Sequence, residues 1–158
     1  MSPHNRILVV SVGKPSNPHL AAATADYERR ARRYWTLEVR EVSGYRSRGA
    51  GPDQVRAREW GQIEAALPKA GDVWVCDQSG ASLTSEALAD TLGKRREEGR
   101  GLAIAIGGAF GLPDAARHRA DMLLALAGWT LPHEIARLVL AEQLYRAGTI
   151  LANEPYHK

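Results

Sequence analysis

The chain has 158 residues, 44% of them hydrophobic and 25% charged, a composition typical of a single globular domain over residues 1–158. Its single cysteine, Cys76, excludes an internal disulfide framework, and no apolar stretch approaches the roughly 20 residues that a membrane span requires. Because the first residues show no cleavage pattern of a secretory signal, we expect a cytoplasmic protein with no membrane partner.

The net charge of +3 is unevenly distributed along the chain. Nine arginines and four acidic residues lie between Glu28 and Arg58, which gives this segment a net charge of +5. Such a basic segment is typical of proteins that bind a phosphate backbone, because their cations release the counterions of the polyanion. A solvated helix face without a partner explains the same charges equally well.

Short β-rich segments alternate with longer amphipathic segments. We predict strands at Arg6–Val12, Trp35–Val42, Asp72–Asp77, Leu102–Ile106 and Met122–Leu126. We predict helices at His19–Arg33, Asp53–Leu67, Thr84–Glu98, Pro113–His118 and Pro132–Leu151. Since several strands are continuous apolar runs, the alternation predicts an α/β fold with a mostly parallel sheet and helices on both faces.

Local signals support these boundaries. Asp53 and Thr84 are predicted N-caps, because short oxygen-bearing side chains accept hydrogen bonds from the first backbone amides of a helix. Ser43–Pro52 is a glycine-rich loop, and we expect it to be mobile. It carries Arg46 and Arg48.

The last predicted helix is apolar around most of its circumference. Its apolar residues cannot all face one sheet, so a second buried face is needed. We expect a subunit interface to provide that face. The alternative is a central helix covered by its own chain.

Two turns follow predicted strands and are candidates for ligand binding. In Ile106–Leu112, glycines let backbone amides approach a ligand at the carboxyl end of a strand. A tight turn without a ligand explains the same glycines equally well. In Leu126–Glu134, an apolar loop leads into a proline at the helix start, and His133 follows in the first helical turn.

His133 has two interpretations, as a functional group or as a histidine that only packs at the helix start. The segment that begins at His133 is not a zinc-binding H-E-x-x-H motif, because Arg137 stands where the second histidine is required. The other histidines show no spacing of metal ligands, so we predict no metal site; they are His4, His19, His118 and His157.

Polar residues near the C-terminus form a second group of candidates. Glu142 and Arg146 are one helical turn apart, in the orientation that favours an ion pair. The chain then ends in NEPYHK, which includes Tyr156 and His157. Such a terminal segment is usually frayed.

Taken together, IGGAFGL, LALAGWTLPHEIARLVLAEQLYRA and the terminal NEPYHK resemble the RlmH family of SPOUT methyltransferases. The resemblance extends over the full chain and includes VSVGK near the start. It implies a SPOUT α/β knot with a C-terminal trefoil knot, and a homodimer. It also implies transfer of a methyl group from S-adenosylmethionine to N3 of a pseudouridine in the 23S rRNA of the assembled ribosome.

The resemblance also implies roles for individual residues. The cofactor segments of the family fall on Cys76, Asp77, Gly107, Gly108, Leu126, Ala127, Gly128, Trp129, Thr130 and Leu131. The imide N3–H must lose a proton as the N–C bond forms, so a side chain that accepts this proton would help. The candidate proton acceptors are His133, Glu142 and His157. Arg146 is a candidate to stabilise the anionic nucleobase, and Tyr156 a candidate to stack on it.

Arg46 and Arg48 are candidates for RNA contacts. Two other functions fit the same residues. One is a methyltransferase of this fold that acts on another RNA or another atom, and the other is an RNA-binding homologue that has lost catalysis.

Overall fold

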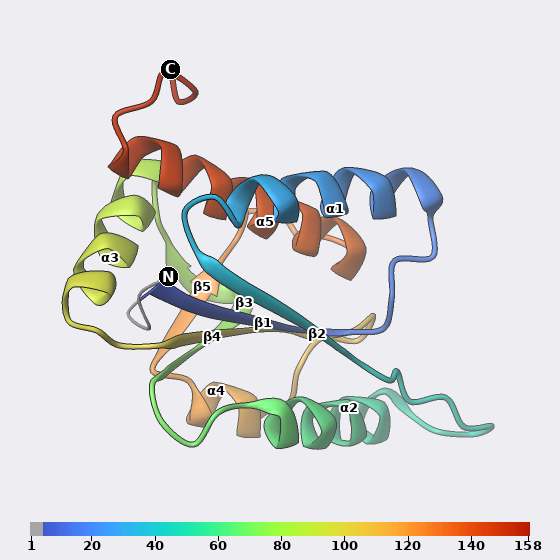
Figure 1. Ribbon diagram of the computed structural model, residues 1–158. Helices are drawn as coiled ribbons and strands as arrows, with labels where there is room; N and C mark the ends of the chain where they lie inside the picture. The colour runs from blue at the N-terminus through green and yellow to red at the C-terminus, as the bar shows by residue number, and fades with distance from the viewer. Residues whose placement is uncertain (1–4) are drawn as a thin grey trace.

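The computed structural model describes residues 5–158 and contains a five-stranded parallel sheet with helices on both faces (Figure 1). The strands are β1 (Arg6–Val12), β2 (Thr36–Val42), β3 (Asp72–Ser82), β4 (Leu102–Ile106) and β5 (Met122–Ala125), in the order β2-β1-β4-β3-β5. The helices are α1 (Pro18–Ala31), α2 (Pro52–Ala66), α3 (Ser85–Glu97), α4 (Asp114–Arg119) and α5 (His133–Leu151). The α/β fold is confirmed. The trefoil knot stays a prediction, and His4 lies outside the described residues.

The two faces of the sheet belong to two apolar cores. Ile7 and Val9 of β1 pack into a core with α1, α3 and α5, whereas Val10 and Val12 pack into the core beneath α2 and α4. Successive strand residues point to opposite faces, so a strand that is buried on both sides must be apolar at every position. The fully buried β4, LAIAI, meets this requirement.

Helix starts follow local chemistry, with one correction. Thr84 is the N-cap of α3, and its hydroxyl accepts a hydrogen bond from the amide of Ala87 at 3.1 Å, as predicted. The prediction for Asp53 is wrong. Gly51 occupies the N-cap of α2 and Pro52 the first helical position, where the missing N–H of proline costs nothing, so Asp53 lies within the first turn.

β3 is longer than its sequence indicates. It extends to Ser82, and its pairing with β5 shifts register between Cys76 and Ala81. A Cβ atom at Gly80 would lie 2.5 Å from the backbone of Leu123, so only glycine permits this close approach. The extension is polar and glycine-containing, and for that reason its sequence is typical of a turn.

α5 is covered in part by its own chain. Leu140 and Leu144, near its centre, are buried against the sheet and the neighbouring helices. Ile135, Leu138 and Val139, nearer its start, are only half buried. The covered-helix alternative therefore holds for the centre of α5, and the stripe formed by Ile135, Leu138 and Val139 is the part that a partner could still cover.

Gly148 of α5 provides a test of this packing. A Cβ atom there would lie 2.3 Å from the ring of Tyr34, so Gly148→Ala should lower the free energy of unfolding by about 1–3 kcal/mol through overpacking. Gly61, which is exposed in α2 with nothing within 4 Å, is the matched control. Urea unfolding should show that Gly61→Ala is neutral or stabilising, and equal midpoints for the two variants would contradict the tight contact.

Candidate functional site

A pocket of about 1130 Å³ lies at one edge of the sheet. It is formed by Cys76, Asp77 and Gln78 in the middle of β3, by the loop after β4 and by the loop after β5. In the order β4-β3-β5, this part of β3 lies between the carboxyl ends of β4 and β5, which is where open α/β sheets bind ligands. Nine of the ten predicted cofactor residues line it: Cys76, Asp77, Gly107, Gly108, Leu126, Ala127, Trp129, Thr130 and Leu131. Gly128 does not.

The glycine turn after β4 is tightly folded. Gly108 and Gly111 form an antiparallel bridge, and the amide of Gly111 donates to the carbonyl of Gly108 at 3.0 Å. A Cβ atom at Gly107 would lie 2.7 Å from the side chain of Leu112, and one at Gly108 would lie 2.7 Å from a carboxylate oxygen of Glu59. Gly107 is therefore required for the turn itself, because a side chain there would also meet the backbone of Gly111, whereas a side chain at Gly108 would meet the end of the Glu59 side chain first.

Asp77 is held as a carboxylate at the edge of the pocket. Its Oδ1 accepts hydrogen bonds from the amide and the hydroxyl of Ser79, and its Oδ2 accepts from Nε of Arg117 at 2.9 Å. Partial burial acts to raise the pKa of Asp77, but the contacts from Ser79 and Arg117 prevail and lower it. Asp77 therefore stays ionised in an ion pair with Arg117, which lines the same pocket.

Cys76 is not suited to nucleophilic chemistry. Burial raises the pKa of its thiol to about 12, with a smaller contribution from the neighbouring charge of Asp77. Because the thiolate is the reactive form, Cys76 presents a neutral, weakly polar surface to the pocket.

The loop after β5 is anchored to the end of β3 and leads into α5. The hydroxyl of Thr130 donates to the side-chain oxygen of Gln78 at 2.8 Å. Pro132 is the N-cap of α5, and His133, its first residue, lines the pocket. The structure therefore brings His133 together with the predicted cofactor residues.

The other four catalytic candidates form a separate group, which we call the tail cluster: Glu142, Arg146, Tyr156 and His157. Glu142 accepts hydrogen bonds from Arg146 and, at 3.0 Å, from the hydroxyl of Tyr156. His157 lies between Arg146, at 3.2 Å, and Glu86 of α3, at 2.8 Å. The terminal segment is docked rather than frayed, which corrects the usual expectation for a chain end.

The environment of Tyr156 favours its neutral form. Burial, together with hydrogen bonds to Tyr27 and Glu142, raises the pKa of its hydroxyl well above the usual value. The centre of its ring lies 4.6 Å from the ring centre of Tyr145, and the guanidinium of Arg146 lies 4.8 Å from the ring centre of Tyr156. In this position Tyr156 is a hydrogen-bond donor to Glu142.

The tail cluster is separated from His133 by part of α5. Glu142 and Arg146 lie 9 and 13 residues after His133, about 14 Å and 20 Å at 1.5 Å per residue, and Tyr156 folds back onto Glu142. Figure 1 shows the terminal segment beyond the far end of α5. The five catalytic candidates therefore occupy two places in one chain.

A buried ion pair that the sequence analysis missed holds α5 in place. Arg137 donates to Glu28 of α1 at 2.9 Å and to Glu41 of β2 at 2.9 Å, and both Arg137 and Glu28 are buried. Although burial opposes the charge, these two carboxylates raise the pKa of Arg137. The available signal was a lone arginine on the apolar face of a helix, because such a charge must be paired.

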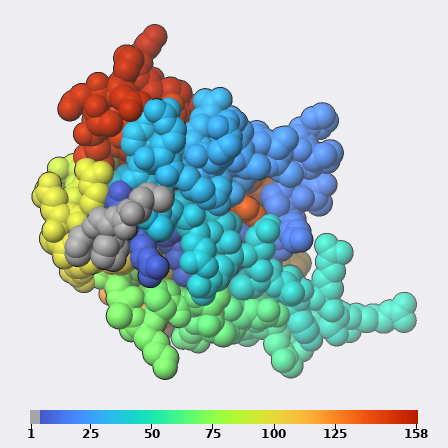
Figure 2. Space-filling view, viewed as in Figure 1, coloured from blue at the N-terminus to red at the C-terminus, as the bar shows by residue number. Residues whose placement is uncertain are grey.

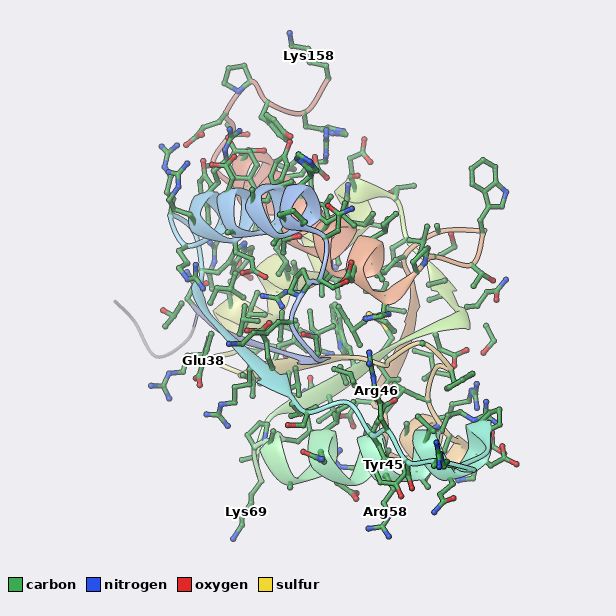
Figure 3. All side chains as sticks on the ribbon, turned by 90° about the vertical axis from the view of Figure 1, so that its right-hand side faces the viewer. Glu38, Tyr45, Arg46, Arg58, Lys69 and Lys158 are labelled. Carbon is green, nitrogen blue, oxygen red and sulfur yellow. The ribbon has the colours of Figure 1, made fainter. Side chains whose placement is uncertain are left out.

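Arg46 and Arg48 lie in a loop that projects from the body of the molecule between β2 and α2 (Figures 1 and 2). Both are exposed, and within residues 5–158 neither forms an ion pair. Tyr45 lies beside them on the α2 side of the molecule, with the guanidinium of Arg58 5.5 Å from its ring centre (Figure 3). This loop therefore presents free positive charge.

Within the described residues we found neither a metal site nor a membrane-spanning helix. No group of three His, Cys, Asp or Glu side chains within residues 5–158 is arranged to hold a metal ion. In the same part of the chain, no helix is long and apolar enough to cross a membrane.

Comparisons with known proteins agree with this architecture. Ribosomal RNA large subunit methyltransferase H of Gemmatimonas aurantiaca is 48% identical over 153 residues, which cover 97% of this chain and 99% of that protein. The protein of the same name from Solidesulfovibrio magneticus is 45% identical over 150 residues, which cover 94% and 96%.

Solved structures share the fold at low sequence identity. A probable methyltransferase from Bordetella pertussis has a TM-score of 0.59 at 17% identity and covers 92% of this chain and 97% of its own. A probable methylase family protein from Haemophilus influenzae has a TM-score of 0.57 at 14% identity, and the match covers 98% of this chain and 71% of that protein. A family model described as predicted SPOUT methyltransferase matches residues 5–157, and the chain belongs to this family.

Proposed function

We propose that this chain is an S-adenosylmethionine-dependent methyltransferase that acts on N3 of a pseudouridine in the 23S rRNA of the assembled ribosome. The observation that carries the proposal is the pocket of about 1130 Å³ between the middle of β3 and the ends of β4 and β5. It occurs in a chain that is 48% identical to a curated ribosomal RNA large subunit methyltransferase H.

The residues of the pocket fit S-adenosylmethionine. Leu126 and Leu131 provide apolar surface for an adenine ring, and the loops after β4 and β5 provide backbone amides and carbonyls. Asp77 and Arg117, paired with each other, supply polar groups at the edge of the pocket. When bound, the cofactor supplies an electrophilic methyl group, and this chemistry needs no metal.

His133 is the candidate base nearest to the pocket. It is the first residue of α5 and lines the pocket with the loop that precedes it, so its imidazole can accept the imide proton of a target base placed there. Glu142 and His157 reach no pocket residue of their own chain. If either takes part in catalysis, it does so at another chain's pocket.

A homodimer would supply that second chain. The half-buried stripe of Ile135, Leu138 and Val139 lies on α5 between the pocket and the tail cluster, and a second copy covering it would bury apolar surface. In an antiparallel arrangement of two α5 helices, the tail cluster of one chain lies beside the pocket of its partner. The site would then be composite.

Methyl transfer in vitro tests the proposed function. Purified protein, labelled S-adenosylmethionine and ribosomes from cells that lack this enzyme should give labelled 23S rRNA. Label in a different RNA would favour another target for the same fold. Binding of RNA without any transfer would favour a non-catalytic homologue.

A pocket-filling substitution tests the cofactor site. Ala127→Leu adds three carbon atoms inside the pocket and should weaken S-adenosylmethionine binding by about tenfold or more, since the ligand and the side chain compete for space. The neighbouring Gly128 does not line the pocket and has nothing within 4 Å, so Gly128→Ala is the matched control. Calorimetry that finds equal affinity in the two variants would argue against this site.

Neutralising Arg46 and Arg48 tests the projecting loop. Both arginines are exposed and free of ion pairs, so the double alanine variant should bind ribosomes more weakly without losing stability. The logarithmic salt slope should fall by roughly 0.7 to 0.9 for each phosphate that is no longer neutralised. Cofactor affinity should not change. Wild-type ribosome affinity and salt slope would leave the loop without a role in RNA binding.

Mixed dimers test whether the tail acts in the partner's pocket. His133→Ala chains and chains lacking Pro155–Lys158 should each be inactive alone. Mixed together, they should recover roughly a quarter of wild-type activity, because half of the dimers are hybrids with one complete composite site. If the tail served its own pocket, no hybrid would be complete and the mixture would stay inactive. Full activity of the deletion variant alone would remove the tail from catalysis.

A further inference from the structure

Two large apolar side chains of the described chain are exposed, and both are aromatic. They are Phe110, 51% exposed, and Trp129, 84% exposed. Both line the pocket described above. Exposed apolar surface at the edge of a pocket marks a contact with a ligand or partner more often than isolated surface residues do.

The strand order places these two aromatic residues on opposite sides of β3. Phe110 lies in the loop after β4 and Trp129 in the loop after β5, and β3 runs between β4 and β5. Cys76 and Asp77, in the middle of β3, line the same pocket. The two aromatic residues therefore belong to one pocket and reach it from the loops of different strands.

The backbone that carries each aromatic residue is anchored. The carbonyl of Phe110 accepts a hydrogen bond from the guanidinium of Arg56 at 3.2 Å. Thr130, next to Trp129, donates to Gln78 at 2.8 Å. Both rings are exposed on loops that are held in place, which lowers the entropy lost when a planar ligand stacks on them.

We propose that Phe110 and Trp129 are an aromatic clamp that stacks on an unpaired base of the RNA substrate at the mouth of the cofactor pocket. The inference rests on the proposed function. A base that is methylated must first leave its stacked neighbours, and aromatic faces replace that stacking whatever the base. The apolar lining of Leu126 and Leu131 is available to the cofactor without either ring.

Tryptophan fluorescence reports on this clamp selectively. Trp35, Trp60 and Trp74 are 1%, 4% and 0% exposed, so iodide should quench Trp129 and leave the other three largely unaffected. The Trp129→Phe variant should lose the quenchable fraction, which verifies the assignment. Trp129 should stay quenchable in the dimer and in the presence of S-adenosylmethionine. Protection in the dimer alone would make Trp129 a subunit contact, and protection by the cofactor alone would make it a cofactor contact; either result overturns the clamp.

Short single-stranded RNA gives the positive arm of the test. An oligonucleotide that contains uridine should protect Trp129 from iodide, whereas an abasic oligonucleotide of equal length should not. Equal effects of the two oligonucleotides would show backbone binding only and would overturn the clamp. This readout needs no methylation, so it separates failure of the clamp from failure of the proposed function.

Kinetics on ribosomes complete the test. Trp129→Ala should lower kcat/KM on ribosomes by roughly 5- to 140-fold, the range expected when one stacking interaction is removed. Trp129→Phe, which retains an aromatic face, should recover most of that activity. Wild-type kcat/KM in Trp129→Ala, or equal loss in the alanine and phenylalanine variants, would contradict stacking.

Discussion

Parallel pairing of β4, β3 and β5 is the constraint on which the site depends. Because the three strands run in the same direction, their carboxyl ends meet at one edge, and the loops that follow them converge there. The pairing requires Gly80, whose backbone lies against Leu123 of β5. The glycine turn at Gly107 and Gly108 then packs against Leu112 and Glu59 and lines the pocket.

α5 transmits this constraint to the rest of the molecule. It starts at the pocket with His133 and is fixed to α1 and β2 by Arg137, so its direction is set at its beginning. A rigid helix of 19 residues then carries Glu142, Arg146 and the terminal segment away from that pocket. Since distance along a helix is fixed at about 1.5 Å per residue, α5 holds Arg146 about 20 Å from His133 within one chain. The proposed homodimer rests on this separation as well as on the half-buried apolar stripe of α5.

The fold could be predicted from the sequence wherever burial leaves a pattern. β1 and β4 are buried on both faces, so their apolar runs located them to the residue. The end of β3 could not be predicted, because Ser79–Ser82 is polar and resembles a turn. Contacts between residues distant in sequence leave no local pattern either.

The same limit applies to the site. Arg137 pairs with Glu28 and Glu41, which precede it in the sequence by 109 and 96 residues. The sequence of the helix does not indicate which carboxylates these are. The glycine turn and the loop before His133 were recognisable as a pocket, because each directly follows a strand. Arg56 and Arg117 also line the pocket, because α2 and α4 pack beside it. The hydrophobic periodicity of the sequence does not specify this packing.

We propose that this pocket serves methylation of N3 of a pseudouridine in 23S rRNA. The most direct measurement is mass spectrometry of 23S rRNA fragments from a strain that lacks this gene, compared with the same strain carrying the gene again. We expect one pseudouridine to lack its methyl group in the deletion strain and to regain it with the intact gene but not with the Ala127→Leu variant. An unchanged set of modified pseudouridines in the deletion strain would contradict the proposal.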